Sequence, residues 1–344
     1  MPSKVPMGKL HWLTRRMSAP PICVHFDSEV VRMMQMSSGK KPSLHMALEV
    51  SRDDEIGMKE ALNSFKGKEC IISIPASDVL VQHIRVSNSE DESEIKSKLT
   101  QQSPEWDNCE VRHVCVAMTG VGTGDAPKQE LLCVGVNGQV AQKYVQELEA
   151  KGAHVLSVTV PLHASLRAFD KLYRRDGDEK ITSMLIDLDE QSSIIMVAHG
   201  SHCVFARQLA LNPKTNEKPW QTPVSSEESA TPDEEFERRQ EQAPRGLYEM
   251  MPSNTIIDGP LEQELRRCLQ HHDALFPQRA VDRIIFSGSA ASDTETCAAI
   301  ASNLGVAGYI ADPSAWIDGA EACASGPSWT TAAGMCLRFS KEAA

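Results

Sequence analysis

Near its start the chain reads Ile22-Cys23-Val24-His25-Phe26-Asp27-Ser28-Glu29-Val30-Val31-Arg32-Met33-Met34-Gln35-Met36. Two apolar runs flank a short polar step, which is typical of two strands joined by a tight turn. Later the chain repeats this layout with Met184-Leu185-Ile186-Asp187-Leu188, the turn Asp189-Glu190-Gln191, and a returning strand from Ser193. The same strand–turn–strand unit therefore occurs twice in the chain.

The segments around these units alternate between strand and helix patterns. The apolar runs predict strands over 70–74, 79–86, 111–118, 131–136, 155–160 and 203–209. The apolar spacing predicts helices over 54–65, 89–102, 139–150, 162–173 and 260–276, with a last helix after Ser328. A third tight turn, Ser287-Gly288-Ser289, follows the strand over 283–286, and Ser292 with Glu295 predicts a capping box for the next helix. The order of elements indicates an α/β fold.

Composition narrows the classes of function. The chain has 344 residues and a net charge of −12, which disfavours nucleic acid as a partner because a phosphate-binding surface needs positive charge. No apolar stretch is long enough to span a bilayer, and the N-terminus has no signal-peptide core. The ten cysteines stand singly without a C-x-x-C motif, so we expect free cytosolic thiols.

Two regions differ from the rest of the chain. Residues 1–19 form a basic tail with Lys and Arg but no acid, and residues 4–17 are a candidate for contact with a membrane surface. Residues 212–254 carry six prolines and many acids, which predicts a disordered acidic insertion.

Other motifs give weaker signals. Gly120-Val121-Gly122-Thr123-Gly124 lacks the Lys-Ser/Thr of a phosphate loop and opens no helix, so we interpret it as a hairpin loop. His271 and His272 lie on a predicted helix, where packing or a charge near the helix end is favoured over metal ligation. The sequence contains no G-x-S-x-G or H-E-x-x-H motif for hydrolase chemistry.

The three turns resemble those of the actin, sugar-kinase and Hsp70 superfamily, in which two hairpins point at a nucleotide's phosphates and a Gly-rich turn covers the adenosine. Several short runs resemble, more narrowly, the type IV pilus assembly protein PilM family. These runs are Phe65-Lys66-Gly67-Lys68, Ile74-Pro75-Ala76-Ser77-Asp78-Val79-Leu80-Val81-Gln82-His83, Gln129-Glu130-Leu131-Leu132, Leu148-Glu149-Ala150-Lys151-Gly152, Phe205-Ala206-Arg207 and Ala311-Asp312-Pro313. Their order and spacing extend the resemblance over residues 20–340.

The resemblance implies an actin-like, ribonuclease H-like bilobal fold with an inserted α+β subdomain. The first lobe would cover 20–183 with the subdomain at about 68–153, the second 184–326, and a C-terminal helix at 327–344 would return to the first lobe. By the same resemblance, the protein would be a cytoplasmic scaffold, peripheral to the inner membrane, that binds the cytoplasmic N-terminal peptide of a PilN-like membrane protein. An active actin-like ATPase, and a cell-division or type II secretion platform on the same fold, remain alternatives.

The nucleotide-binding turns depart from the family pattern. The first turn normally reads Asp-x-Gly-Ser-Ser with a Lys four residues on, and the second reads Asp-x-Gly with hydroxyls beyond it. The matching residues here are His25, Asp27, Ser28 and Arg32 in the first turn and Asp187, Asp189, Ser192 and Ser193 in the second. The adenosine turn has Gly288-Ser289 in place of Gly-Gly.

These changes disfavour ATP. Glycines let backbone N–H groups approach phosphate oxygens, whereas Asp27 and Asp189 would each place a carboxylate there. Each carboxylate adds a repulsion of roughly 4 kcal/mol at 4 Å and an effective dielectric constant of 20. We therefore expect a degenerate cleft that binds ATP and Mg²⁺ weakly or not at all, and no hydrolysis.

A metal site is the less favoured interpretation of the same residues. If the lobes face each other, His25, Asp27, Asp187 and Asp189 could converge on Mn²⁺ or Zn²⁺. No close ligand spacing supports this, so we predict polar residues that fill a disused cleft, with no catalytic residue, no metal and no cofactor.

Overall fold

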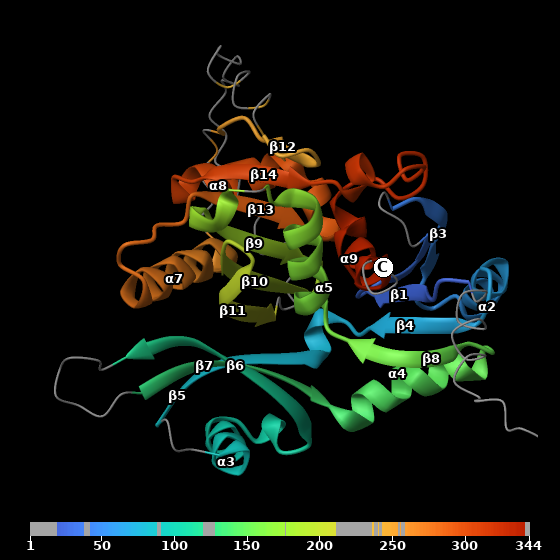
Figure 1. The fold of residues 1–344 in the computed structure, drawn as a ribbon, viewed down its shortest axis with the longest axis horizontal. Helices are drawn as coiled ribbons and strands as arrows, with labels where there is room; N and C mark the ends of the chain where they lie inside the picture. Colours follow the sequence, from blue (N-terminus) through green and yellow to red (C-terminus); the bar gives the residue numbers. More distant parts are fainter. Residues whose placement is uncertain are drawn as a thin grey trace, which may run out of the picture.

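The computed structural model describes residues 19–37, 42–87, 91–119, 128–175, 177–210, 236, 240, 243–253, 255 and 259–340. The predicted basic tail, except for its last residue, the loop Gly120–Gly124 and most of the insertion at 212–254 lie outside these residues. Figure 1 shows two lobes side by side, with a third unit of strands and helices below them.

The first lobe is built on a five-stranded sheet in the order β3-β2-β1-β4-β8. The strands are β1 (Ile22–Phe26), β2 (Val30–Met36), β3 (Leu44–Ser51), β4 (Glu69–Ser73) and β8 (His154–Thr159). The first three strands are antiparallel neighbours, and β4 and β8 run parallel to β1. The first predicted hairpin is therefore confirmed, while β3 had not been predicted.

The sheet of the second lobe repeats this topology, in the order β11-β10-β9-β13-β14-β12. Its strands are β9 (Thr182–Leu188), β10 (Ser192–His199), β11 (His202–Ala210), β13 (Arg283–Ser287), β14 (Ala307–Ala311) and β12 (Leu247–Glu249). The first five match the first lobe in both order and direction. The repeat seen in the sequence is thus a repeated sheet.

Strand β12 corrects the predicted extent of the insertion. Disorder was expected up to residue 254, but Leu247–Glu249 form a strand that pairs antiparallel with β14. Leu247 is only 3% exposed, so the strand is anchored by burial as well as by the ladder. The strand was not predicted because it is short and follows residues of acidic composition.

A third unit separates β4 from β8. Its sheet has the order β5-β7-β6, and all its pairs are antiparallel. Its elements are β5 (Val79–Ser87), α3 (Glu92–Gln102), β6 (Cys109–Thr119), β7 (Lys128–Asn137) and α4 (Gly138–Ala150). Ile84, Leu99 and Trp106 belong to a small core of its own. Because it has its own core, we treat this unit as the inserted subdomain.

The remaining helices cover the two main sheets. They are α2 (Glu55–Ser64), α5 (Pro161–Ala168), α7 (Pro260–Leu275), α8 (Thr294–Leu304) and α9 (Thr330–Ser340). Helix α5 continues as a π-helical turn over Phe169–Tyr173. The N-cap of α8 is Asp293, whose carboxylate accepts from the Thr296 N–H at 3.1 Å, so the predicted cap at Ser292 is wrong by one residue. None of the described helices combines the length and apolarity needed to cross a membrane.

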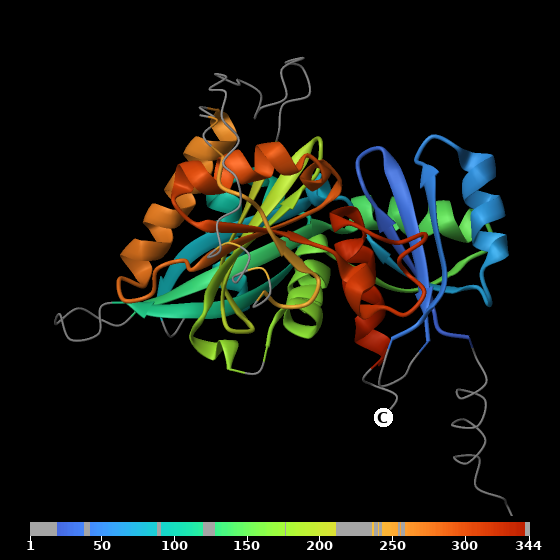
Figure 2. The same ribbon diagram turned by 90° about the horizontal axis from the view of Figure 1, so that it is seen from above.

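Helices α5 and α9 lie between the lobes (Figure 2). Helix α9 also contacts β1 and β2, so the end of the chain packs on the first lobe. Gly334 permits the close crossing, because an added Cβ would lie 2.0 Å from the Ala164 carbonyl oxygen on α5. Buried residues of both lobes, among them Phe26, Ile194 and Met335, belong to one continuous core. The lobes are therefore held against each other, and the turns between them meet.

Candidate functional site

The candidate site is the place where the turns of the two lobes face each other. In the β1–β2 turn the Asp27 N–H donates to the Val30 carbonyl at 2.9 Å, and in the β9–β10 turn the Asp189 N–H donates to the Ser192 carbonyl at 3.0 Å. The two turns thus share one geometry, with an aspartate at the same position of each. That position is the one at which the resemblance described above implies glycine.

Asp27 is buried and held by its own hairpin. Its carboxylate accepts from the Ser28 N–H at 2.9 Å and forms an ion pair with Arg32. The Arg32 guanidinium also pairs with Glu49 at 2.7 Å between Nε and Oε2. Because the positive charge of Arg32 is shared by two carboxylates of its own lobe, it is already neutralised within the protein.

Asp189 of the second lobe contacts the turn of the first lobe. Its Oδ1 accepts from the Ser28 hydroxyl at 2.6 Å and from the Glu190 N–H at 2.6 Å, and the Ser289 hydroxyl lies 3.4 Å away. The carboxyl group of Asp189 also interacts with that of Asp27, which raises the pKa of Asp189 and lowers that of Asp27. The two hairpin turns are therefore linked directly, without room for a phosphate between these side chains.

The acid pair shares one proton. Burial, together with the neighbouring Asp27, raises the pKa of Asp189 to about 8. Burial also opposes ionisation of Asp27, but the hydrogen bond from Asp189, with His25 and Arg32, outweighs it and lowers the pKa of Asp27 to about 2. At neutral pH, Asp189 is thus protonated. The raised pKa favours a neutral Asp189, which lessens the repulsion that two carboxylates would exert.

His25 and Asp187 complete the polar lining. Burial lowers the pKa of His25 to about 4, so the imidazole is neutral, and its Nδ1 is buried without a hydrogen-bond partner. Asp187 accepts from the hydroxyls of Ser165 at 2.9 Å and Thr331 at 3.0 Å. Burial raises the pKa of Asp187, with a further contribution from Asp27. Asp187 is therefore fixed to α5 and α9 rather than directed at an open space.

The third turn approaches the same point through Gly288. Its φ is +91°, and an added Cβ would lie 2.2 Å from the Leu188 carbonyl oxygen. Glycine is required here by this contact between the turn and the strand β9. The N–H of Gly288 donates to the Pro327 carbonyl at 3.1 Å, so it is not directed at a ligand.

What remains between the lobes is a cavity of about 10 Å³, the space of roughly one water molecule. Small-molecule sites usually enclose 300 to 1,000 Å³, so this cavity is far smaller than such a site. The lining residues are His25, Phe26, Asp27, Ala76, Pro161, Asp187, Asp189, Gly288, Ser328 and Thr331.

The predicted residues fall into three groups. His25, Asp27, Asp187, Asp189 and Gly288 line the cavity. Ser28, Arg32 and Ser289 reach it only through hydrogen bonds or ion pairs with Asp27 or Asp189. The hydroxyls of Ser192 and Ser193 are buried without hydrogen-bond partners and are not part of the lining.

Sequence reasoning missed the lining residues that lie outside the turns. Ala76 follows β4, Pro161 opens α5, and Ser328 and Thr331 lie at the start of α9. Ser165, which holds Asp187, lies on α5 as well. No local pattern marks these residues. The crossing of α5 and α9 brings Pro161, Ser328 and Thr331 to the cavity, whereas Ala76 reaches it from the segment after β4.

The four cleft residues proposed as metal ligands do not form a compact ligand set. Within the described part of the chain, the group of His, Cys, Asp and Glu residues with ligand atoms close enough for one ion is His83, Glu130 and His271, which lies elsewhere. His272, the neighbour of His271, is fully buried and its Nε2 lies 2.9 Å from Nε2 of His199.

A second polar network connects the cleft to the subdomain. Arg52 donates to the Asp27 carbonyl at 3.4 Å and to the Tyr144 hydroxyl at 2.6 Å, and this hydroxyl donates to Asp78 at 2.6 Å. The Tyr144 ring on α4 also packs against Phe26 at 4.9 Å between ring centroids. The first turn is thus supported by Arg52 and, through Tyr144, by helix α4 of the subdomain.

Comparison with known proteins gives one family and several related folds. The family model described as type IV pilus assembly protein PilM matches residues 58–339. No curated protein sequence gives a significant match. Among solved structures, the PilM–PilN type IV pilus biogenesis complex superposes with a TM-score of 0.64 and 14% identity over 93% of this chain and 98% of the other. This similarity shows a common actin-like fold.

Two weaker similarities carry no argument by themselves. The cytoplasmic domain of EpsL, an inner-membrane component of the type II secretion system of Vibrio cholerae, has a TM-score of 0.39 and 10% identity over 55% of this chain and 70% of its own. The ethanolamine utilization protein EutJ from Carboxydothermus hydrogenoformans has a TM-score of 0.41 and 9% identity over 96% of each chain.

Proposed function

The chain belongs to the type IV pilus assembly protein PilM family, and from this premise we propose that it is a scaffold that binds the cytoplasmic N-terminal peptide of a PilN-like inner-membrane protein. The observation that carries the proposal is the match of one family model to residues 58–339, across both lobes and the subdomain. The similarity to a PilM–PilN complex over 93% of the chain supports the choice of partner. In this proposal the protein is cytoplasmic and is held at the inner membrane by its partner.

We further propose that the scaffold works without nucleotide. Three features support this: the cavity of about 10 Å³, the hydrogen bond from Ser28 to Asp189 between the lobes, and the ion pair that neutralises Arg32. ATP would have to separate the two turns and displace Asp27 and Asp189 before its phosphates could reach the backbone. Opening the lobes would also expose part of their common core.

Peptide binding tests the function directly. The probe is the cytoplasmic N-terminal peptide of a PilN-like inner-membrane protein from the same organism, titrated into the full chain by calorimetry in buffer with EDTA and no nucleotide. We expect one peptide per chain and no binding of a scrambled peptide. Failure of the native peptide to bind, with the chain folded by circular dichroism, would contradict the proposal.

A nucleotide titration tests the absence of ATP separately. We expect neither a heat of binding nor a release of phosphate with ATP and Mg²⁺ at about 1 mM. This concentration is roughly the upper end of the KM values of ordinary enzymes. Micromolar affinity would show that the lobes open readily, and phosphate release would favour the active ATPase. Because the peptide experiment contains no nucleotide, the two proposals can fail independently.

Residues 4–17 are proposed as a secondary contact with anionic lipid. Sedimentation with vesicles of phosphatidylglycerol tests this, comparing the full chain with a variant in which Lys4, Lys9, Arg15 and Arg16 are all replaced by Gln. Equal sedimentation of both proteins would exclude the contact.

A further inference from the structure

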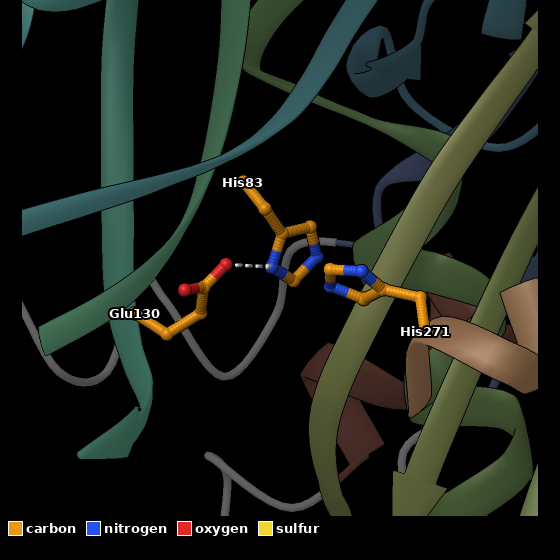
Figure 3. A group of neighbouring side chains, drawn as sticks. All are labelled: His83, Glu130 and His271. Carbon is orange, nitrogen blue, oxygen red and sulfur yellow. Dashed lines mark ion pairs between the residues drawn. The ribbon is translucent and has the colours of Figure 1, made fainter. Parts of the chain in front are cut away.

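Three side chains meet where the subdomain touches the second lobe (Figure 3). His83 comes from β5, Glu130 from β7 and His271 from α7. Strand β5 lies against β11, the edge strand of the second sheet. The cluster therefore joins two units whose sequences are far apart, and it lies outside the cleft.

Two histidine nitrogens of this cluster lack hydrogen-bond partners. One ligand atom from each residue lies within 4.8 Å of the other two, and Nδ1 of His83 is 3.8 Å from Oε1 of Glu130. This distance is too long for a direct hydrogen bond. Nδ1 of His83 and Nε2 of His271 are both buried, and neither has a hydrogen-bond partner. Buried polar atoms without partners call for an explanation, and a bound ion is one of those that proteins use.

The surrounding residues hold the cluster in place. Glu130 is 3% exposed, and its other oxygen is 2.8 Å from Nε of Arg85. The His83 ring stacks on Phe205 with centroids 5.0 Å apart, and the His271 ring meets His83 edge-on at 5.8 Å. Burial lowers the pKa of His83 to about 4, so this imidazole is neutral and can act as a ligand at neutral pH.

We propose that His83, Glu130 and His271 form a Zn²⁺ site that ties the subdomain to the second lobe. Two imidazoles and one carboxylate are a common donor set for Zn²⁺, with a fourth position left for water. The ligand atoms of a tetrahedral Zn²⁺ site lie about 3.4 Å apart, as follows from bonds of about 2.1 Å. The ligand atoms, which lie within 4.8 Å of one another, therefore need to approach by up to about 1.4 Å. Nitrogen donors disfavour Mg²⁺ and Ca²⁺.

Metal binding would change one hydrogen bond between the subdomain and the second lobe. Nε2 of His83 accepts from the Ala206 N–H on β11 at 3.3 Å, so the proton of the neutral ring is on Nδ1. When Nδ1 binds Zn²⁺, this proton leaves Nδ1 and Nε2 takes up one, so the ring stays neutral. The Ala206 N–H then faces a donor and loses its acceptor. Zn²⁺ thus replaces a long hydrogen bond with a metal link between the same two units.

Zinc titration of the full, untagged chain tests the site. The exposed thiols Cys115 and Cys323 are first alkylated so that they cannot bind the metal. We expect one Zn²⁺ per chain in competition with a chromogenic chelator, at least tenfold weaker binding in Glu130→Gln and His271→Gln, and no change in His113→Gln, an exposed histidine of the same subdomain. Mg²⁺ at about 1 mM should not compete with Zn²⁺ for the site, because nitrogen donors disfavour Mg²⁺.

Equal zinc affinity in the wild type and in both ligand variants would overturn the proposal. The absence of any binding at about 100 µM Zn²⁺ would also overturn it, because this concentration is far above the dissociation constants of structural zinc sites. The two variants serve each other as a check on folding, because His271 and Glu130 lie on different units. Hydrogen exchange gives a second measurement. The Ala206 amide should exchange faster with Zn²⁺ bound, and unchanged protection at full zinc occupancy would overturn the assignment of Nδ1 of His83.

Discussion

Asp27 and Asp189 show how two acids can be buried at one point. One carboxylate keeps its charge because Arg32 and a backbone N–H stabilise it, and the other acid keeps its proton because burial beside the first makes ionisation costly. Two like charges at this place would repel each other, whereas one charge and one proton form a hydrogen bond. The pair therefore links the turns at neutral pH instead of separating them.

Asp189→Asn tests this proton directly. The pKa of Asp189 is raised from 3.8 to about 8 in the folded protein, so between these values the folded chain holds a proton that the unfolded chain has released. The free energy of unfolding contributed by this group therefore falls as the pH rises from about 4 to about 8, and is constant above that. An amide cannot lose this proton, so the variant should be more stable than the wild type by about 2 kcal/mol at pH 9.

Urea unfolding at pH 5, 7 and 9 measures the effect. The difference between Asp189→Asn and the wild type should grow with pH, while Glu190→Gln, a change of the exposed acid next to it, should give a constant difference. A constant difference for Asp189→Asn as well would mean that the acid pair is ionised throughout.

Among the elements, the crossing of α5 and α9 decides how the lobes meet. The helix α9 lies close to α5 because position 334 has no side chain. In an isolated helix, alanine would be better than glycine by about 1 kcal/mol. Here the backbone of α5 occupies the place of the missing Cβ, so tertiary contact overrides helix propensity.

Gly334→Ala should therefore destabilise the protein by about 3 kcal/mol, because α9 must move away from α5 and from the core. Gly138→Ala is the matched control, since it also adds a Cβ in a helix but meets nothing within 4 Å. Thermal unfolding of both variants measures the contrast. Similar melting temperatures for the two would show that the helices are not packed as closely as described.

At the scale of the whole molecule, buried ionisable groups set the pH of greatest stability. Burial lowers the pKa of His25, His83 and His199 to about 4. Between pH 4 and 6.5 the unfolded chain binds protons that the folded chain does not, so these groups reduce stability as the pH falls through that range. Asp187 and Asp189, whose pKa values burial raises, act in the opposite direction, but they are two groups against four, because burial also lowers the pKa of His272.

We therefore expect the greatest stability between pH 6 and 7, with a loss of about 2 kcal/mol at pH 5. Urea midpoints at half-unit steps from pH 4.5 to 9 measure the profile. Replacing His199 by Gln should make the acid side less steep, while His154→Gln, an exposed histidine, should leave it unchanged. A profile that is level from pH 5 to 8 would contradict the assignment of buried neutral histidines.

Local sequence was a sufficient guide where one element carries its own signal. The hairpins at Asp27 and Asp189, the strand before Gly288 and the capped helix α3 follow from apolar runs and turn residues close together in the chain. Strand β3 was missed because its exposed and buried residues alternate without a strong apolar run, and β12 because it has three residues within an acidic region. Their ladders with β2 and β14 determine them.

By itself, the sequence determined the repeated strand–turn–strand unit, the family it resembles and the presence of Asp27 and Asp189 where the resemblance implies glycine. Only the tertiary structure decided what those losses mean. Protonation of Asp189, the hydrogen bond from Ser28 and the narrowness of the cavity all require groups from both lobes at one point. The meeting of His83 and Glu130 with His271 likewise depends on the subdomain lying against the second lobe. Residue types are local, but burial, pKa and the distance between donor atoms depend on neighbours that are distant in the chain.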